Sequence, residues 1–152
     1  MRFFFYGTLL DHDVTALVLG RRLPPAAYVP ASLPGHARWR AKGASYPVVV
    51  ADPRGEVAGA IVCGLSTRDV GYLAAYEGPG YRIAPLKVRL RGKLVTVSVF
   101  EPIVESGKGY RDSRLQPSRE LWDLALWQRR HKRAFAARLR RAFSGRPVYS
   151  RQ

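Results

Sequence analysis

The sequence predicts an α+β domain, a small mixed β-barrel or sheet with flanking helices, that ends in a basic amphipathic helix. Three observations support this fold class: short apolar runs bounded by turn-forming residues, two expected hairpins with a helical segment between them, and 3–4 apolar spacing near the C-terminus. The 152 residues favour one domain, and an apolar fraction of 47% suits a folded core. We therefore interpret residues 1–152 as a single domain.

The N-terminal segment reads as a strand, a turn and a helix. Residues 2–6 form an apolar, aromatic run that stops at Gly7, which is typical of a buried strand that enters a turn. Apolar side chains at helical spacing predict a helix over residues 9–18, with acidic residues near its start. Prolines then divide residues 24–34 into extended segments and turns.

A hairpin and a short helix are expected in the middle of the chain. The hairpin joins residues 47–51 to residues 57–65 through Asp-Pro-Arg-Gly at 52–55, because proline presets the first central position of a turn and glycine accepts a positive φ. The helix is expected over residues 67–76 and ends at a Gly-Pro-Gly sequence.

The C-terminal third contains a second hairpin and a long helix. Residues 87–90 alternate basic and apolar side chains, and an Arg-Gly turn then leads the chain into a second strand over residues 94–100. Residues 104–114 are expected to form a loop. From residue 117 to about residue 144, apolar side chains at 3–4 spacing predict one amphipathic helix, with Ser118 as its N-cap.

Positive charge is concentrated in this helix. The chain has 26 Lys and Arg residues against 11 Asp and Glu residues, a net charge of +15, and no acidic residue follows Asp123. Gly145 and Pro147 are expected to end the helix. Its basic face suits weak binding of nucleic acid or an anionic surface, and it is equally typical of a solvated surface helix.

The residues exclude several classes of protein. Cys63 is the single cysteine, so no disulfide scaffold forms, and its apolar neighbours favour a buried structural thiol. The three histidines lie far apart in the sequence and predict no metal site. No apolar run reaches the ~18 residues of a membrane helix, and no glycine-rich nucleotide loop occurs. We expect a cytoplasmic protein that does not insert into membranes.

Two segments carry candidate chemistry. In residues 6–9 (YGTL), a strand enters a glycine turn ahead of a helix, an arrangement in which backbone N–H groups can bind an anion such as a carboxylate. In residues 76–82 (YEGPGYR), Glu77 lies at the end of a helix between two tyrosines. A single glutamate in a turn is more often a surface charge. The two segments therefore indicate a functional site only when they are taken together.

Together, these motifs resemble the γ-glutamylcyclotransferase superfamily, in its γ-glutamylamine cyclotransferase-like branch. Members open with a strand and a Tyr-Gly-Thr-Leu loop, and their catalytic glutamate lies in a Tyr-Glu-Gly-x-x-Tyr-Arg pattern. An aspartate often precedes that pattern, where this chain has Leu-Ala-Ala at 73–75. The resemblance covers about residues 2–103, which implies a family-like core at residues 1–103 with the basic helix of residues 117–144 packed on it.

The resemblance implies an enzyme, a γ-glutamyl amide cyclotransferase. In that reaction the α-amine of the substrate attacks its own γ-carbonyl and releases 5-oxoproline and an amine. The nucleophile belongs to the substrate, so the resemblance implies no cofactor and no metal. It leaves open whether the amine is an amino acid, a peptide, a lysine side chain or a polyamine-like group, and it indicates no oligomeric state. Glu77 is expected to be the general acid and base, and the substrate is expected to contact Tyr6, Gly7, Thr8, Leu9 and Tyr81.

A non-catalytic protein is the alternative. Since a fold does not fix a function, the same domain can serve as the scaffold of a nucleic-acid or anionic-surface binding protein that acts through its basic helix. Release of 5-oxoproline favours the enzyme. Salt-dependent retention on heparin or RNA favours the binding protein.

Overall fold

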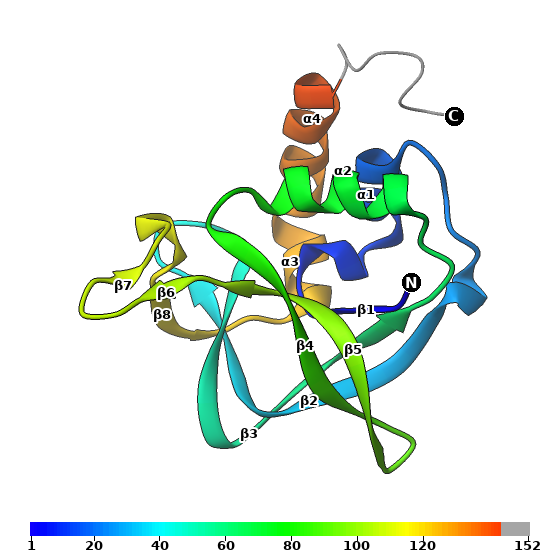
Figure 1. The fold of residues 1–152 in the computed structure, drawn as a ribbon. Helices are drawn as coiled ribbons and strands as arrows, with labels where there is room; N and C mark the ends of the chain where they lie inside the picture. The colour runs from blue at the N-terminus through cyan, green and yellow to red at the C-terminus, as the bar shows by residue number, and fades with distance from the viewer. Residues whose placement is uncertain (144–152) are drawn as a thin grey trace.

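The computed structural model describes residues 1–143, and the helix end expected at Gly145 and Pro147 lies outside the described residues. Figure 1 shows the order of the elements. The strands are β1 (Phe3–Phe5), β2 (Tyr28–Ala41), β3 (Pro47–Val62), β4 (Tyr81–Leu90), β5 (Lys93–Pro102), β6 (Val104–Glu105), β7 (Gly109–Tyr110) and β8 (Pro117–Leu121). The helices are α1 (His12–Leu19), α2 (Thr67–Glu77), α3 (Leu124–Arg130) and α4 (Lys132–Phe143), with the 3₁₀ helices η1 (Thr8–Leu10), η2 (Pro25–Ala27) and η3 (Ser113–Leu115).

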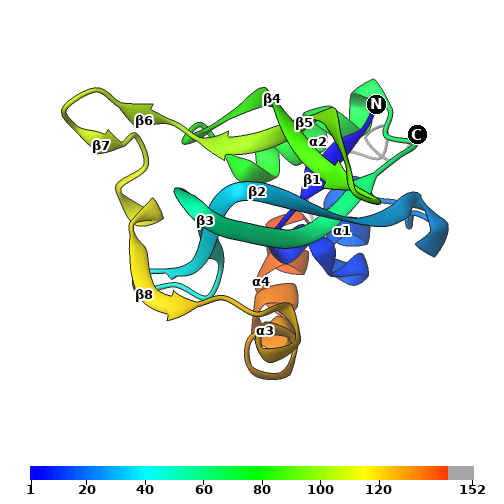
Figure 2. The same ribbon diagram turned by 90° about the horizontal axis from the view of Figure 1, so that it is seen from below.

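One curled sheet organises the fold. Its strand order is β3-β1-β5-β4-β2-β8, and β2 also pairs with β3. This additional pairing brings the sheet back on itself, so that β3, β1, β5, β4 and β2 form a closed ring with β8 attached to β2. Helices α1, α2 and α4 gather on one side of the ring, and Figure 2 shows α3 and β8 beside β2 and β3. The predicted α+β class, a mixed sheet with flanking helices, is confirmed.

Apolar side chains fill both faces of β1. Phe4 packs inside the ring with Leu33 and Ile61, while Phe3 packs outside it against the helices with Trp127; all five are at most 2% exposed. Burial of an aromatic or branched side chain contributes roughly 1.5–3 kcal/mol. Because β1 is buried on both faces, it holds the end of the strand, and the loop that follows it, in a fixed place.

Two predicted elements appear where they were expected. Helix α2 begins after Ser66, whose hydroxyl accepts a hydrogen bond from the Asp69 N–H while the Asp69 carboxylate accepts one from the Ser66 N–H. Strands β4 and β5 form a hairpin through Arg91 and Gly92, which both have a positive φ, as a two-residue turn of this kind requires. The position of α2 matters most, because it ends at Glu77.

The hairpin predicted around residues 52–55 is wrong. Strand β3 is continuous and pairs along its length with β2, so the reversal lies between β2 and β3. The register places His36 opposite Ala51 and Pro34 opposite Glu56, so residues 52–55 bulge out opposite Gly35. A Cβ at Gly55 would lie 2.1 Å from the His36 carbonyl oxygen, so glycine is needed there for close backbone contact. The turn-forming residues at 52–55 therefore make a bulge and not a chain reversal, because β2 pairs with β3 both before and after them.

The C-terminal segment differs from the single helix that the sequence predicts. Residues 117–121 form β8, the first helix begins at Leu124 with Asp123 in place of Ser118 as its N-cap, and His131 separates α3 from α4. Both helices pack on the domain. None of the helices within residues 1–143 is long and apolar enough to span a membrane.

Candidate functional site

A cavity of about 260 Å³ lies where β1 ends. It is bounded by η1, by the end of α2 and by the adjoining ends of β4 and β5. The structure brings all the predicted site residues to this one cavity, whose lining includes Tyr6, Gly7, Thr8, Leu9, Glu77 and Tyr81. Since about 70 residues separate the two motifs in the sequence, the fold itself creates their proximity.

Residues 6–9 form a turn whose carbonyl groups are held by the protein. Arg38 Nη1 donates a hydrogen bond to the Tyr6 carbonyl at 2.7 Å, and the Leu10 N–H donates to the Gly7 carbonyl at 2.9 Å. No hydrogen bond from the N–H groups of Gly7, Thr8 or Leu9 to any of residues 1–143 is found. The turn therefore lines the cavity with N–H donors that the described protein leaves unused, as an anion-binding turn does.

Glu77 is the last residue of α2, and the chain turns away from it at Gly78, where φ is +86°. The side chain is half-buried because it faces the cavity. No hydrogen bond or ion pair of its carboxyl group is found within residues 1–143. Burial raises the pKa of Glu77 from the ordinary 4.5 to about 8. A carboxyl group with this pKa exchanges a proton readily near neutral pH.

Tyrosines surround Glu77. The Tyr6 hydroxyl donates a hydrogen bond to the Phe100 carbonyl at 2.7 Å, so its proton is already used in a bond to the backbone. The Tyr76 hydroxyl lies 2.7 Å from Thr8 Oγ1 and links the two motifs directly. Burial, and then the nearby Glu77 carboxyl, raises the pKa of Tyr76 and of Tyr81. Both phenols therefore stay neutral, and both line the cavity together with Glu77.

The sequence analysis did not assign several further lining residues to the site, among them Tyr46, Asp112, Arg114 and Phe135. Tyr46 precedes β3, Asp112 and Arg114 flank or belong to η3, and Phe135 comes from α4. Phe135 belongs to the apolar stripe of the predicted helix, which was the one available signal. The others lie in turns whose place depends on tertiary contacts, such as the hydrogen bond from Trp122 Nε1 to the Ser45 carbonyl.

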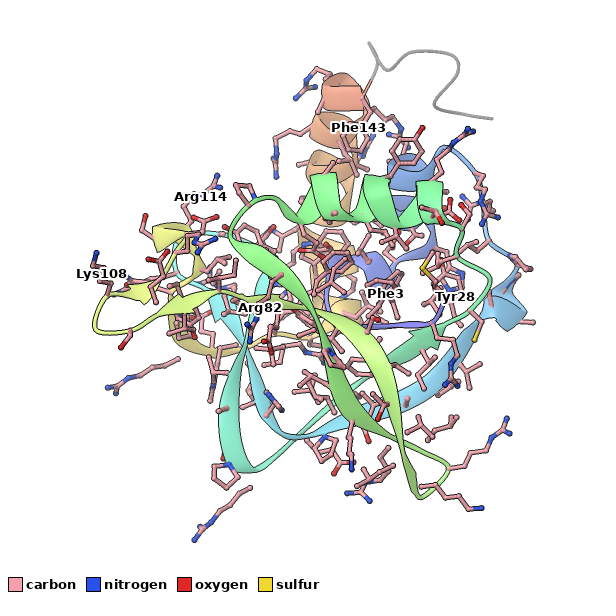
Figure 3. The ribbon with its side chains drawn as sticks, in the orientation of Figure 1. Phe3, Tyr28, Arg82, Lys108, Arg114 and Phe143 are labelled. Atoms are coloured by element: carbon pink, nitrogen blue, oxygen red, sulfur yellow. The ribbon has the colours of Figure 1, made fainter. Side chains whose placement is uncertain are left out.

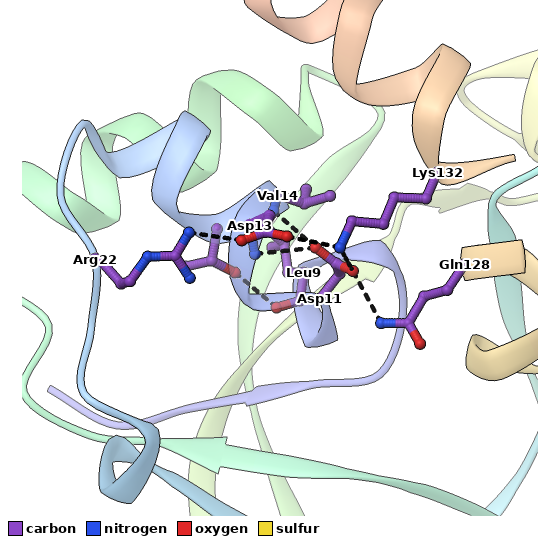
Figure 4. Close-up of polar contacts among 8 residues, drawn as sticks. Leu9, Asp11, Asp13, Val14, Arg22, Gln128 and Lys132 are labelled. Carbon is purple, nitrogen blue, oxygen red and sulfur yellow. Dashed lines mark hydrogen bonds and ion pairs between the residues drawn. The ribbon is translucent and has the colours of Figure 1, made fainter.

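Two carboxylates, Asp11 and Asp13, form a cluster at the start of α1 (Figure 4). Asp11 is 1% exposed, caps α1 through the N–H groups of Asp13 and Val14, and accepts hydrogen bonds from Gln128 and Lys132. Burial alone would raise the pKa of Asp11, but these hydrogen bonds outweigh it and lower the pKa. Hydrogen bonds from Lys132 and Arg22 lower the pKa of Asp13 to about 2. The cluster fastens the C-terminal helices to the segment that follows the YGTL turn.

Within the part of the chain that the structure describes, no group of three or more His, Cys, Asp or Glu side chains is placed to hold a metal ion. The charged side chains that line the cavity are Glu77, Asp112 and Arg114.

The chain is thus a small α+β protein with a closed ring of strands, in which the half-buried Glu77 and the YGTL turn line one cavity. The family model described as "Gamma-glutamyl cyclotransferase, AIG2-like" matches residues 3–123, and the chain belongs to this family. The match continues past residue 103, where the sequence motifs end, and includes β8. Membership supports a cyclotransferase-type function.

The chain is similar to plant proteins in sequence and to several solved structures in fold. Protein AIG2 C of Arabidopsis thaliana is 30% identical over 138 residues, which are 91% of this chain and 78% of that protein. A solution structure of another Arabidopsis thaliana protein has a TM-score of 0.61 at 28% identity and covers 94% of this chain and 90% of its own. A structure named gamma-glutamyl cyclotransferase has a TM-score of 0.52 at 16% identity, with coverages of 68% and 66%, and shows the shared fold.

Proposed function

We propose that this protein is a γ-glutamyl amide cyclotransferase in which Glu77 is the general acid and base. The observation that carries the proposal is the Glu77 carboxyl group, which lies unpaired within the described residues at a cavity shared with the YGTL turn. The substrate supplies the nucleophile, so the protein must position the substrate and move protons. These are the two tasks for which the cavity has suitable groups.

Glu77 moves the protons. Its carboxylate accepts a proton from the α-ammonium of the substrate, and the freed amine attacks the γ-carbonyl carbon to close a five-membered ring. Glu77 then donates the proton to the amide nitrogen as the C–N bond breaks. One further proton passes from the ring nitrogen to the released amine, and the products are 5-oxoproline and an ammonium ion. A pKa of about 8 suits a group that must both accept and donate.

The YGTL turn holds the substrate. The N–H groups of Gly7, Thr8 and Leu9 bind its α-carboxylate, which fixes the α-amine on the side of Glu77. Tyr81 forms the opposite wall. Orientation of this kind supplies several kcal/mol of the barrier, because the attack becomes intramolecular within a fixed geometry.

Formation of 5-oxoproline from a panel of γ-glutamyl amides tests the proposal. The wild type is expected to release 5-oxoproline from at least one amide, and Glu77→Gln is expected to lower kcat by about 10²–10⁴-fold, because glutamine keeps the shape but cannot take a proton. KM is expected to change little.

Thr8→Val is the matched control. It removes a hydroxyl and its hydrogen bond to Tyr76 but keeps the backbone N–H groups, so we expect a loss of about 2–10-fold in kcat/KM. Unchanged turnover in Glu77→Gln contradicts the role of Glu77. No 5-oxoproline from any amide contradicts the proposed activity.

A second candidate function is binding of a polyanion such as RNA through α3 and α4. The observation that favours it is a run of exposed arginines without an acidic residue on either helix, including Arg129, Arg130, Arg133 and Arg140. Retention on immobilised RNA that falls steeply with salt supports this function. Retention that Arg130→Gln, Arg133→Gln and Arg140→Gln together leave unchanged contradicts it.

A further inference from the structure

Arg38 carries its positive charge in an uncommon setting for an arginine. Arg82 and Arg114, which Figure 3 labels, have mostly exposed side chains that pair with the carboxylates of Glu101 and Asp112. No ion pair of Arg38 is found within residues 1–143, and its Nε is buried there without a hydrogen-bond partner. Burial lowers the pKa of Arg38. A buried charge without a carboxylate partner costs stability, which indicates a task beyond holding strands together.

Two backbone carbonyls and a tryptophan ring hold the Arg38 guanidinium. Arg38 Nη1 donates to the Tyr6 carbonyl at 2.7 Å and to the Ala58 carbonyl at 2.8 Å. Arg38 Cζ lies 5.0 Å from the centroid of the Trp122 ring, whose face attracts a cation. The pairing of β1 with β3 ends at Phe5, so Arg38 joins the two chain segments just beyond the point where their own pairing stops.

The bond to the Tyr6 carbonyl also sets the direction of the next N–H group. The Tyr6 carbonyl and the Gly7 N–H belong to one planar trans peptide, in which the two groups point in opposite directions. Because the carbonyl points to the guanidinium, the Gly7 N–H points away from it. Gly7 lines the cavity at the end of β1, whereas Arg38 is not among the lining residues. Arg38 thus holds the turn from behind.

The guanidinium also brings a positive charge close to the turn. A hydrogen bond to the carbonyl of a peptide polarises that peptide and makes its N–H a stronger donor. The charge of a partly buried group is screened less by salt than the charge of an exposed group. Arg38 therefore supplies positive potential at the turn, which favours an anion at the Gly7 N–H.

We propose that Arg38 is a positioning residue, which aims the Gly7 N–H into the cavity and adds positive potential for the carboxylate that binds there. This inference rests on the proposed function, in which the YGTL turn binds the α-carboxylate of the substrate. Arg38 acts through the Tyr6–Gly7 peptide and does not touch the substrate. The carboxylate is bound in the ground state and in the transition state alike, so loss of Arg38 raises KM and leaves kcat nearly unchanged.

Binding of 5-oxoproline to the ¹⁵N-labelled protein, followed by NMR, tests the inference. 5-Oxoproline carries the carboxylate, and 2-pyrrolidinone has the same ring without it. We expect 5-oxoproline to shift the Gly7 amide signal of the wild type and 2-pyrrolidinone to leave it in place. Arg38→Met keeps the aliphatic stem and removes the guanidinium. It is expected to raise the Kd of 5-oxoproline by about 10–100-fold, as loss of a charge-assisted hydrogen bond does, and to reduce the shift of Gly7.

Arg40→Met is the matched control. Arg40 lies on the same strand and its Nη1 also donates to a backbone carbonyl, that of Ala44 at 2.8 Å, but no hydrogen bond from it to residues 6–9 is found within residues 1–143. Its Kd for 5-oxoproline is expected to stay within about twofold of the wild type. Arg38→Lys keeps a charged donor without the guanidinium fork, and a loss of about 3–10-fold is expected. It decides the question where Arg38→Met does not fold.

The outcomes separate positioning from a purely structural role. A structural Arg38 lowers the stability to urea but leaves the Kd and the Gly7 shift of the folded variant unchanged, and that result overturns the inference. A wild type whose Gly7 signal does not respond to 5-oxoproline, or a variant that loses kcat at unchanged KM, overturns it as well. If no γ-glutamyl amide is turned over while 5-oxoproline binding still depends on Arg38, the inference stands and the proposed activity fails.

Discussion

Asp11 is a buried carboxyl group and Glu77 is a half-buried one, and their surroundings shift their pKa values in opposite directions. Asp11 accepts hydrogen bonds from Gln128, Lys132 and backbone N–H groups, which outweigh its burial and lower its pKa. For Glu77 burial acts alone and raises the pKa to about 8. Burial by itself therefore does not distinguish a structural acid from a reactive one. The distinction lies in the partners that the fold provides.

The hydrogen-bond partners also give the Asp11 cluster and Glu77 different roles in the molecule. The Asp11 cluster joins α1 to α3 and α4 and so fixes the exit of the YGTL turn (Figure 4). Within residues 1–143 the Glu77 side chain makes no such bond, and its position is set by its place as the last residue of α2. A carboxyl group that contributes little to cohesion is free to exchange its proton with a substrate.

The pH profile of kcat/KM is expected to show the largest effect. A general base must be ionised, and the ionised fraction of Glu77 rises with pH up to its pKa of about 8. We expect kcat/KM to rise roughly tenfold per pH unit between about pH 5.5 and 7.5 and to level off above about pH 8. A profile that is flat over this range, or that levels near pH 4.5, contradicts the assignment of Glu77 as the base.

Lys132→Met tests the structural role of Asp11. It removes one cation from the buried Asp11 and is expected to lower the free energy of unfolding by about 1–3 kcal/mol at pH 7, as measured by urea denaturation. Arg22→Met is the matched control, because its pair with Asp13 is exposed and is expected to contribute less than about 1 kcal/mol. Equal losses in the two variants contradict the special role of the buried pair.

Lys132→Met is also expected to change how the free energy of unfolding depends on pH in acid. Because the pKa of Asp13 is lowered, the folded state binds fewer protons than the unfolded state between its pKa of about 2 and the ordinary 3.8. The stability that Asp13 contributes is fully present above pH 3.8 and is lost as the pH falls toward 2. The difference in stability between wild type and Lys132→Met is therefore expected to shrink below about pH 4.

The smallest effect on turnover is expected on the exposed face of the C-terminal helices. Arg130→Gln, Arg133→Gln and Arg140→Gln together remove exposed charges, and none of these residues lines the cavity. We expect kcat/KM to stay within about twofold at physiological salt, where such charges are screened. A loss comparable to that of Glu77→Gln contradicts the separation of the catalytic cavity from this surface.

The sequence predicted what depends on local signals. The Gly-Pro-Gly sequence that ends α2, the Arg91-Gly92 turn and the two motifs of the cavity are all short patterns with a direct physical meaning. It did not predict the long pairing of β2 with β3, because the turn residues at 52–55 are locally the same in a bulge and in a reversal. Lys132 and Asp11 are far apart in the sequence, and nothing at either position indicates that they pair.

The most direct test of the difference between the two carboxyl groups is an NMR titration of the folded wild-type protein labelled with ¹³C at the glutamate and aspartate carboxyl carbons. The glutamate signal that Glu77→Gln removes is expected to titrate near pH 8, and the Asp11 signal is expected to titrate below its ordinary 3.8. A Glu77 signal that titrates near the ordinary 4.5 would contradict the account, because such a carboxyl group behaves as an exposed surface charge.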